Sequence, residues 1–373
     1  MRRLRNGKVR IKGTVQVHDA SEALGSSVQP LKPVSPPKKA QAGGGKVKAV
    51  KTKPPTPPLS DRNAGAVSAG PENVDELNGL DLESLNLTDK EIPARQLEKL
   101  SRIGSGGFKD VFVGIWKVGK RRNKVAIADI REKLTEMDIK ELGLLRDLKH
   151  ENIVRFIGVS IPEDTAKTGI PCMIVSELCS NGDLWDYVRN VKPPPDLQIF
   201  RMLLETAKGL EYLHMHSIVH RDVKSSNVLV TRERSCKIND FGLARVKTSQ
   251  RSKMKSVVGT INWQAVELWC RQPQYNEKVD VWSAAMTFWE TLQWYEDYKS
   301  YPFEGMNDFV IYEEVGKEGK RPPTDKIAAQ FGEEIVKLLN RMWDTDPRKR
   351  PTMDMVCKDL ERLIEVKEME MDQ

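Results

Sequence analysis

Long apolar segments are missing from this sequence. No apolar run reaches the length of about 18 residues that a membrane-spanning helix needs. The first twelve residues are basic, but they lack the apolar core of a secretory signal. We therefore expect no transmembrane segment, and a location in the cytoplasm or the nucleus.

Paired cysteines are also missing. The five cysteines are an odd number and form no Cys-x-x-Cys pair. This pattern is typical of reduced thiols inside the cell, and it provides neither a disulfide framework nor a zinc site. The cysteines are Cys172, Cys179, Cys236, Cys270 and Cys357.

Most of the chain lacks a net charge. Residues 1–80 carry 14 Lys and Arg against 6 Asp and Glu, a balance of +8, whereas the remainder carries 46 against 47, a balance of −1. A basic segment of this kind either attracts nucleic acid or an anionic membrane, or forms a solvated arm. We favour the solvated arm and expect no nucleic-acid partner. Salt-sensitive binding by residues 1–80 alone would support the tethering alternative.

The basic segment has almost no aromatic or long apolar side chains between residues 20 and 75 and is rich in Pro, Gly, Ser, Ala and Lys. Such a composition buries too little surface to offset the entropy of folding, so we predict a disordered arm over residues 1–83 and a linker over 84–95. Within the arm, Lys51–Pro57 places Pro54 and Pro57 on one face of a polyproline helix. This stretch is either a stiff linker, which we favour, or a docking peptide for a proline-reading domain.

The rest of the chain changes from strand-like to helical patterns. Val111–Val113 and Val125–Ile127 are strand-like and are separated by a polar turn over 119–124. Apolar residues recur at helical spacing from 137 to 148 and again after Asp196. We therefore expect a small strand-rich lobe followed by a larger helical lobe.

Three motifs carry chemistry. A glycine-rich turn, Gly104 to Gly107, lets backbone N–H groups approach phosphate oxygens. His-Arg-Asp222 is followed five residues later by Asn227, a spacing that suits a base for a hydroxyl proton and a metal ligand. Asp240-Phe-Gly provides a second carboxylate for Mg²⁺. Each motif alone is weak, but their joint order makes coincidence implausible.

With these motifs the sequence resembles the protein kinase family, over about residues 96–365. The resemblance implies an α+β bilobal fold, with a small antiparallel β-rich N-lobe over about 96–176 and a larger α-helical C-lobe over about 180–365. A tail over 366–373 follows. Lys224, together with Gly259-Thr-Ile-Asn-Trp263, resembles the tyrosine-kinase-like serine/threonine group.

The resemblance also implies roles for individual residues. Asp222 would be the catalytic base, Lys224 a contact to the transferred phosphate, and Glu141 the helix-C glutamate; Asn227 and Asp240 would hold Mg²⁺. Glu267 and Arg350 resemble the buried ion pair of the larger lobe, and Asp280 resembles its anchoring aspartate. The residues expected to contact ATP are Ile103, Gly104, Ser105, Gly106, Gly107, Val111, Ala126, Glu177, Cys179 and Leu229.

One signature residue is missing. The third strand of a kinase ends in a lysine that contacts the nucleotide phosphates, but here the strand reads Val-Ala-Ile-Ala128. Lys109 stands where the third glycine of the loop belongs, on the neighbouring strand. Because neighbouring strands lie about 4.8 Å apart, its flexible side chain can reach the vacated place. The with-no-lysine kinases resemble this arrangement.

We therefore interpret the chain as a serine/threonine protein kinase, with dual specificity left open, that uses ATP and Mg²⁺ and acts on protein substrates. The alternative is a nucleotide-binding pseudokinase that serves as a signalling scaffold or switch. An upstream kinase acting on the loop 248–256 would activate it, with the phosphate docking on Arg221. Phosphorylation sites in that loop are Thr248, Ser249, Ser252 and Ser256.

Overall fold

A computed structural model describes residues 87–105, 109–130, 143–161, 172–241, 244–246, 260–270 and 273–372. All of them belong to one compact unit, Val74–Gln373. Predictions for the arm, for Lys51–Pro57 and for the loop 248–256 lie outside these residues. Within the described ranges, no helix combines the length and the apolar character that crossing a bilayer requires.

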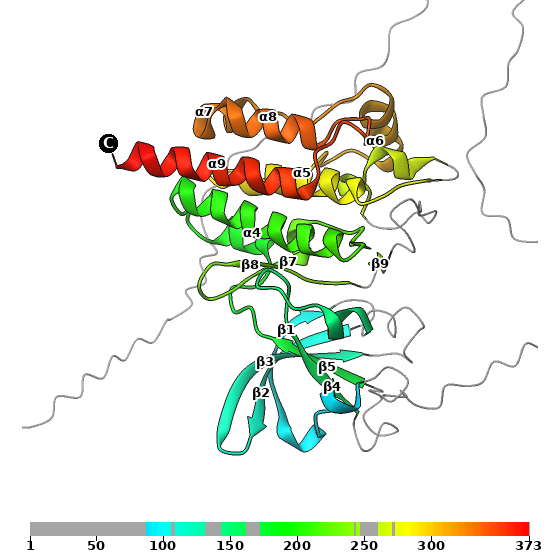
Figure 1. Ribbon diagram of the computed structural model, residues 1–373, viewed down its shortest axis with the longest axis vertical. Coiled ribbons are helices and arrows are strands. Elements are labelled where there is room, and N and C mark those ends of the chain that lie inside the picture. The colour runs from blue at the N-terminus through cyan, green and yellow to red at the C-terminus, as the bar shows by residue number, and fades with distance from the viewer. Residues whose placement is uncertain are drawn as a thin grey trace, which may run out of the picture. The chain divides into compact units, whose positions relative to one another are not determined.

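The N-lobe is a five-stranded antiparallel sheet in the order β1-β2-β3-β5-β4 (Figure 1). Two 3-10 turns, η1 (Thr88–Lys90) and η2 (Ala94–Gln96), precede it. The strands are β1 (Leu97–Ser105), β2 (Lys109–Val118), β3 (Arg121–Ile130), β4 (Phe156–Ser160) and β5 (Cys172–Glu177). Between β3 and β4, residues 143–147 are helical.

The β2–β3 hairpin corrects the expected polar turn over 119–124. Pairing continues to Val118 and Arg121, so the turn consists only of Gly119 and Lys120. Gly119 has φ +57°, a conformation that glycine adopts without steric cost. The polar, exposed residues 121–124 suggested a turn, but backbone pairing does not require apolar side chains where a hairpin is solvated on both faces.

The N-lobe buries side chains from the segment before its first strand. Leu87 is fully buried and packs with Ile130, Val159 and Cys172. Ile92 packs on the other face of the sheet, and its N–H donates to Val159 O at 2.7 Å. Part of the expected linker therefore contacts the sheet directly.

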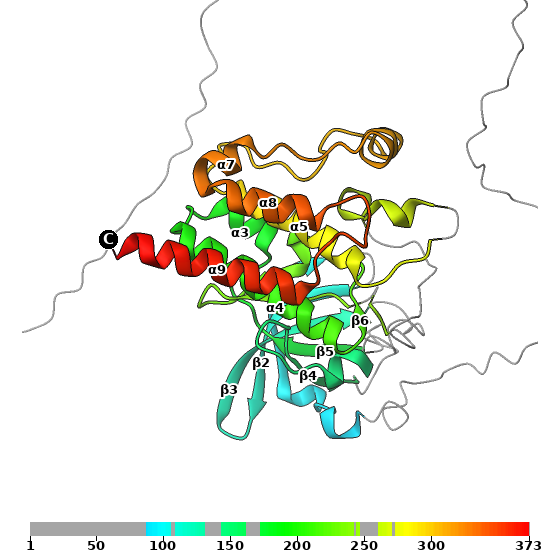
Figure 2. The same ribbon diagram turned by 45° about the horizontal axis from the view of Figure 1, so that its top comes forward.

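The C-lobe is built on long helices. Helix α4 (Asp196–Met215) packs along α9 (Met353–Met371), and both contact the core around α5 (Lys278–Leu292) (Figure 2). Every residue of α5 from Val279 to Leu292 is buried, so this helix is the centre of the lobe. The other helices are α3 (Leu184–Asn190), α6 (Asp308–Ile311), the π-helix η6 (Tyr312–Lys317), α7 (Asp325–Phe331) and α8 (Glu333–Met342).

Short strands and 3-10 turns follow α4 in the chain. Strands β6 (Ile218–Val219) and β9 (Arg245–Val246) pair, as do β7 (Val228–Val230) and β8 (Cys236–Ile238). The 3-10 turns are η3 (Ser225–Asn227), η4 (Ile261–Trp263) and η5 (Val266–Trp269). A strand-rich lobe followed by a helical lobe confirms the expected α+β bilobal fold.

Candidate active site

A cavity of about 300 Å³ lies between the N-lobe sheet and the β7 region of the C-lobe. Most residues expected to contact ATP line it, and Ala128 and Lys109 lie on its wall. Ser105 is described but is not among the lining residues, and Gly106 and Gly107 lie outside the described part of the chain. The expected residues that line the cavity are Ile103, Gly104, Val111, Ala126, Glu177, Cys179 and Leu229.

Residues between Ser176 and Asp183 line one side of this cavity. Cys179 is 6% exposed, and burial raises the pKa of its thiol to about 12, so it remains protonated. Burial also raises the pKa of Asp183, although its carboxylate accepts a hydrogen bond from Asp186 N at the start of α3. A cavity lined by aliphatic side chains together with a few polar groups is typical of a small-molecule site.

Lys109 begins β2, and its side chain points to the cavity. Val111 lies two residues on, so both share one face of the strand. Val111 pairs with Ala128 on β3, which places Lys109 diagonal to Ala128 on that face. Lys109 Nζ lies 3.4 Å from Asp240 Oδ1 across 131 residues of sequence.

The carboxylate of Asp222 is held on both oxygens. Oδ2 lies 2.8 Å from Lys224 Nζ and accepts from Asn227 Nδ2 at 3.0 Å. Oδ1 accepts from the N–H and the hydroxyl of Thr260, each at 3.2 Å. Lys224 Nζ also donates to Thr260 Oγ1 at 2.9 Å. These contacts bring the expected base and the expected phosphate-contacting lysine together.

The catalytic loop is held in place by Asp280 of α5. Its carboxylate accepts from the backbone N–H groups of His220 and Arg221, each at 2.8 Å, and contacts His214 Nε2 at 2.9 Å. Arg221 has φ +71°, which is costly for a residue with a side chain, so the loop needs such an anchor. Burial acts to raise the pKa of Asp280, but the contacts with His214, His220 and Arg221 N–H outweigh it and lower the pKa.

Asp240 has an unusual backbone conformation, with φ +64°. His220 lies beside this segment: its Nε2 contacts Asn239 O at 3.0 Å, and its ring meets the Phe241 ring edge-on at 5.4 Å. An edge-to-face contact therefore joins the rings of His220 and Phe241. This contact links the segment that contains Asp222 to the segment after β8 that contains Asp240.

Asn227 and Asp240 fit the chemistry of a Mg²⁺ site. Asn227 Nδ2 donates to Asp222 O and Oδ2, and no described residue donates a hydrogen bond to its carbonyl oxygen Oδ1. Amide and carboxylate oxygens are the ligands that Mg²⁺ prefers, and substrate phosphates supply most of the rest. One asparagine and one aspartate are therefore sufficient protein ligands.

Three further expectations from the sequence concern Glu141, the Glu267–Arg350 ion pair and Arg221. Glu141 lies outside the described residues, so its role as the helix-C glutamate stays a prediction. The Glu267–Arg350 ion pair is confirmed, at 2.7 Å. Arg221 is only 3% exposed and donates to Tyr275 OH at 2.9 Å, so a phosphate would have to compete with this contact.

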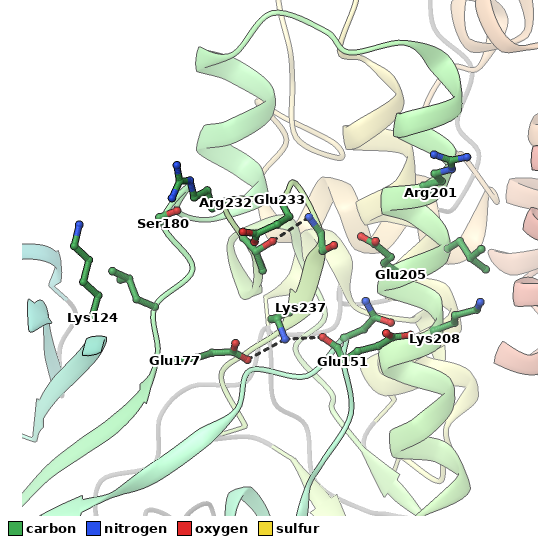
Figure 3. Close-up of a pocket in the computed structure, with 15 residues that line it drawn as sticks. Lys124, Glu151, Glu177, Ser180, Arg201, Glu205, Lys208, Arg232, Glu233 and Lys237 are labelled. Atoms are coloured by element: carbon green, nitrogen blue, oxygen red, sulfur yellow. Dashed lines mark hydrogen bonds and ion pairs between the residues drawn. The ribbon is translucent and has the colours of Figure 1, made fainter. Parts of the chain in front are cut away.

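A larger cavity of about 700 Å³ lies beside Glu177 and Leu178, bounded by α4 and the β7–β8 turn (Figure 3). Its walls are charged, and much of the charge is already paired. Lys237 lies 3.0 Å from Glu177 and donates to Glu151 O at 2.6 Å, while Lys208 lies 3.0 Å from Glu361. None of the expected catalytic or metal-binding residues lines this cavity.

Thr260 is a site residue that the sequence interpretation used only as a group signature. Its bonds to Asp222 and Lys224 place it in the site. Thr260 lies 38 residues after Asp222 in the sequence. A local sequence pattern therefore could not indicate their contact. The available signal was the Gly-Thr pair that precedes Trp263.

Comparison with known proteins gives consistent matches. Residues 97–360 match the family described as protein tyrosine and serine/threonine kinase. Mitogen-activated protein kinase kinase kinase 13 of Mus musculus is 35% identical over 263 residues, which are 70% of this chain and 25% of that protein. Mitogen-activated protein kinase kinase kinase 12 of Rattus norvegicus is 32% identical over 272 residues, 73% of this chain and 28% of that protein.

A third relative comes from Dictyostelium discoideum. The probable serine/threonine-protein kinase drkB of Dictyostelium discoideum is 30% identical over 284 residues, 74% of this chain and 38% of that protein. The chain thus spans about a quarter of the length of the first two curated relatives that it matches.

Proposed function

This chain belongs to the protein tyrosine and serine/threonine kinase family, within the tyrosine-kinase-like group, and we propose that it is an active serine/threonine kinase in which Lys109 replaces the missing third-strand lysine. The reaction would move the γ-phosphoryl group of ATP to a protein hydroxyl. Such transfer depends on positioning and on stabilising phosphate charge. Each group that it needs has a candidate here.

The observation that carries this proposal is the 3.4 Å separation of Lys109 Nζ and Asp240 Oδ1. A cation that contacts the phosphates must lie near the carboxylate that holds their metal ion. Ala128 has no side chain beyond Cβ, so it leaves room for the ammonium on the shared face of the sheet. The chemistry requires a positive charge at this place and not a particular strand of origin.

Asp222 would orient the acceptor hydroxyl and take up its proton, because its carboxylate is held by Lys224, Asn227 and Thr260. Lys224 would pass from Asp222 and Thr260 to the transferred phosphate. Asn227 and Asp240 would hold Mg²⁺, which when bound neutralises phosphate charge. The slot lined by Val111, Ala126 and Leu229 would hold the adenine ring.

The serine/threonine preference is supported by Lys224 and by the names of the relatives. The mitogen-activated protein kinase kinase kinase names suggest a signalling role upstream of other kinases, which we include in the proposal together with a location in the cytoplasm. Protein substrates and an upstream kinase that acts on the loop 248–256 would be its partners. The domain limits 96–365, with a preceding arm and linker, are part of this proposal.

The decisive experiment measures phosphoryl transfer from labelled ATP with Mg²⁺ to myelin basic protein. We compare the native chain with Lys109→Met, Asp222→Asn and Ala128→Lys, and use Lys120→Met as the matched control because Lys120 is exposed in the hairpin turn. Transfer should be lost in the first two variants and unchanged in the control. Ala128→Lys combined with Lys109→Met should restore part of it.

The pseudokinase alternative makes a different prediction. Nucleotide would still raise the melting temperature of the native chain. Phosphoryl transfer, however, would already be absent in the native chain, so none of the variants would lower it. A native chain that binds ATP and transfers nothing, with its 248–256 loop phosphorylated, would establish the scaffold. Transfer that survives Lys109→Met would reject the relocated lysine while retaining the kinase.

A further inference from the structure

Asp129 is a buried acid beside the position of the missing lysine, and the kinase motifs assign it no role. It follows Ala128 on β3 and is 5% exposed. Its Oδ2 accepts a hydrogen bond from Lys99 Nζ at 2.6 Å. No described residue donates a hydrogen bond to its other oxygen, Oδ1. Because successive side chains of a strand point to opposite faces, Asp129 lies on the outer face of the sheet, opposite the cavity that Ala128 lines.

Lys99 reaches Asp129 across a whole strand. Lys99 belongs to β1 and Asp129 to β3, and β2 lies between these two strands. The Lys99 ammonium lies over the ring of Phe112 on β2, 5.4 Å from its centre. The ion pair therefore ties the first strand of the sheet to the third strand over the intervening one.

A second acid lies directly opposite Asp129. Asp110 on β2 pairs with Asp129 in the β2–β3 ladder, so that two carboxylates face each other on the outer face. Like charges in this arrangement destabilise a strand pair. Arg102 of β1 forms an ion pair with Asp110 at 3.6 Å, so each of the two acids has a cation from β1. We call Lys99, Arg102, Asp110 and Asp129 the charge clamp.

The charge clamp lies where the sheet holds Lys109. Lys109 directly precedes Asp110, and it pairs with Ile130 at the end of the β2–β3 ladder. The pairing of β1 with β2 is irregular between Lys99 and Gly104, with two shifts of register. Such irregularities disrupt the backbone ladder locally. The side chains of the clamp therefore connect the strands where the backbone does so least.

The surroundings of Asp129 do not favour a charged residue. Met173 pairs with it on β5 and is buried and apolar. Replacing a buried ion pair by apolar residues of similar size is often neutral or stabilising, because both charges lose their hydration. The Asp129–Lys99 pair therefore contributes a defined geometry more than it contributes stability.

We propose that Asp129, acting through Lys99, is a positioning residue for Lys109: the charge clamp on the outer face fixes the start of β2, so that the Lys109 ammonium stays beside Asp240 on the inner face. The inference rests on the proposed kinase function. It deepens that function, because it assigns the place of the relocated cation to a buried ion pair that touches neither the nucleotide nor the acceptor.

The first test measures phosphoryl transfer to myelin basic protein at varied ATP. Lys99→Met removes the ammonium, and Asp129→Asn removes the carboxylate charge at nearly the same size. Both should lower kcat/KM for ATP roughly tenfold, because a displacement of about 1 Å in a reacting group can cost up to about a hundredfold. The KM for the acceptor should change by less than about twofold. Lys99→Arg keeps the charge and should retain most of the activity.

Lys117→Met is the matched control. Lys117 of β2 forms an exposed ion pair with Glu98 of β1 at 3.0 Å, and it lies at the opposite end of β2 from Lys109. Its loss should not change kcat/KM for ATP, since exposed pairs contribute little. If Lys99 acts through Asp129, the double variant Lys99→Met with Asp129→Asn should be no worse than the poorer single variant. Additive losses, or an equal loss in Lys117→Met, would overturn the inference.

A cation from another strand separates positioning from general damage to the sheet. In Lys109→Met with Ala128→Lys the cation comes from β3, which is also held by β5 at this point, where Ala128 pairs with Ile174. Adding Lys99→Met should lower the remaining transfer by less than about twofold. A tenfold loss in this background as well would show that the clamp only maintains the sheet, and the inference would fail.

A labelling experiment separates this inference from the kinase function. An acyl-phosphate derivative of ATP transfers its acyl group to a lysine amine beside the bound phosphates, and the nucleotide leaves. With a saturating concentration of this probe, mass spectrometry should find the acyl group on Lys109 of the native chain and of Lys117→Met. The labelling rate of Lys109 should fall roughly tenfold in Lys99→Met and in Asp129→Asn.

The labelling result does not depend on phosphoryl transfer. If the native chain transfers no phosphate but Lys109 is labelled in this pattern, the kinase function fails and the positioning of Lys109 by Asp129 stands. Labelling of Lys109 that is absent from the native chain, or that is equally fast in Lys99→Met, overturns the inference in either case.

Discussion

Arg350 and Glu267 form a bidentate ion pair across 83 residues of sequence, with N–O distances of 2.7 and 2.8 Å. Arg350 is 2% exposed and also donates to Asp344 O and Lys278 O. Its guanidinium therefore joins η5, which contains Glu267, to the start of α5 and to the segment before α9. Many members of the protein kinase family carry a proline directly before this glutamate. Val266 stands there in this chain, and the ion pair is still formed.

Removal of either partner should destabilise the C-lobe. Glu267→Gln or Arg350→Met leaves a buried polar group without its counterpart, and we expect a loss of about 3–5 kcal/mol in the free energy of unfolding. Arg350→Lys should recover little, because an ammonium cannot make two parallel bonds to the carboxylate. Urea unfolding followed by circular dichroism measures this. Stability within 1 kcal/mol of the native value (about the worth of an exposed pair) would contradict it.

Thr260 offers a test of the catalytic geometry. Thr260→Val removes the hydroxyl that bonds to both Asp222 and Lys224 while it keeps the shape of the side chain. We expect kcat to fall by roughly tenfold, the effect of one lost hydrogen bond in the site. Thr260→Ser keeps the hydroxyl and should retain most of the activity. Equal activity in the valine and serine variants would show that the hydroxyl has no role.

The stability of the protein should depend on pH through Glu290. Its pKa rises from 4.5 to about 8 on folding because the carboxyl is buried in α5, so the folded state binds the proton more tightly. The stabilisation by this proton is complete below about pH 4.5 and is lost as the pH rises to 8, at about 1.4 kcal/mol per pH unit. Urea unfolding of the native chain and Glu290→Gln at pH 5, 6.5 and 8 should show the difference. Parallel pH profiles would refute this assignment.

Gly209 in α4 should not tolerate a larger residue. Alanine normally stabilises a helix interior relative to glycine by up to about 1 kcal/mol. At this position, however, a Cβ would lie 2.6 Å from the backbone oxygen of Asn152 and 2.8 Å from Ile238. We expect Gly209→Ala to destabilise the protein by about 1–3 kcal/mol, measured as a lower urea midpoint. Gly143→Ala is the control, because no residue in the described part of the chain lies within 4 Å of its Cβ position.

Local patterns determined much of this protein from its sequence. The order of Asp222, Asn227 and Asp240 indicated the kinase fold and its catalytic loop because these spacings lie within short, contiguous segments. Alternating and helical apolar periods placed the strands and helices, since each reports which face a residue buries. The Glu267–Arg350 pair was also expected, although only through the resemblance to the family.

Tertiary structure decided the contacts that join distant segments. The proximity of Lys109 to Asp240 depends on how the start of β2 is placed against the segment that follows β8. The hydrophobic periodicity of these two segments does not predict that placement. Leu87 is buried although it precedes the first strand, because the sheet offers it an apolar surface. Thr260 meets Asp222 and Lys224 only because the chain between them folds back, and α5 holds the nearby Trp263 through Glu290 and Ser283. Sequence spacing records which groups the chain carries, whereas packing of the whole core decides which of them meet.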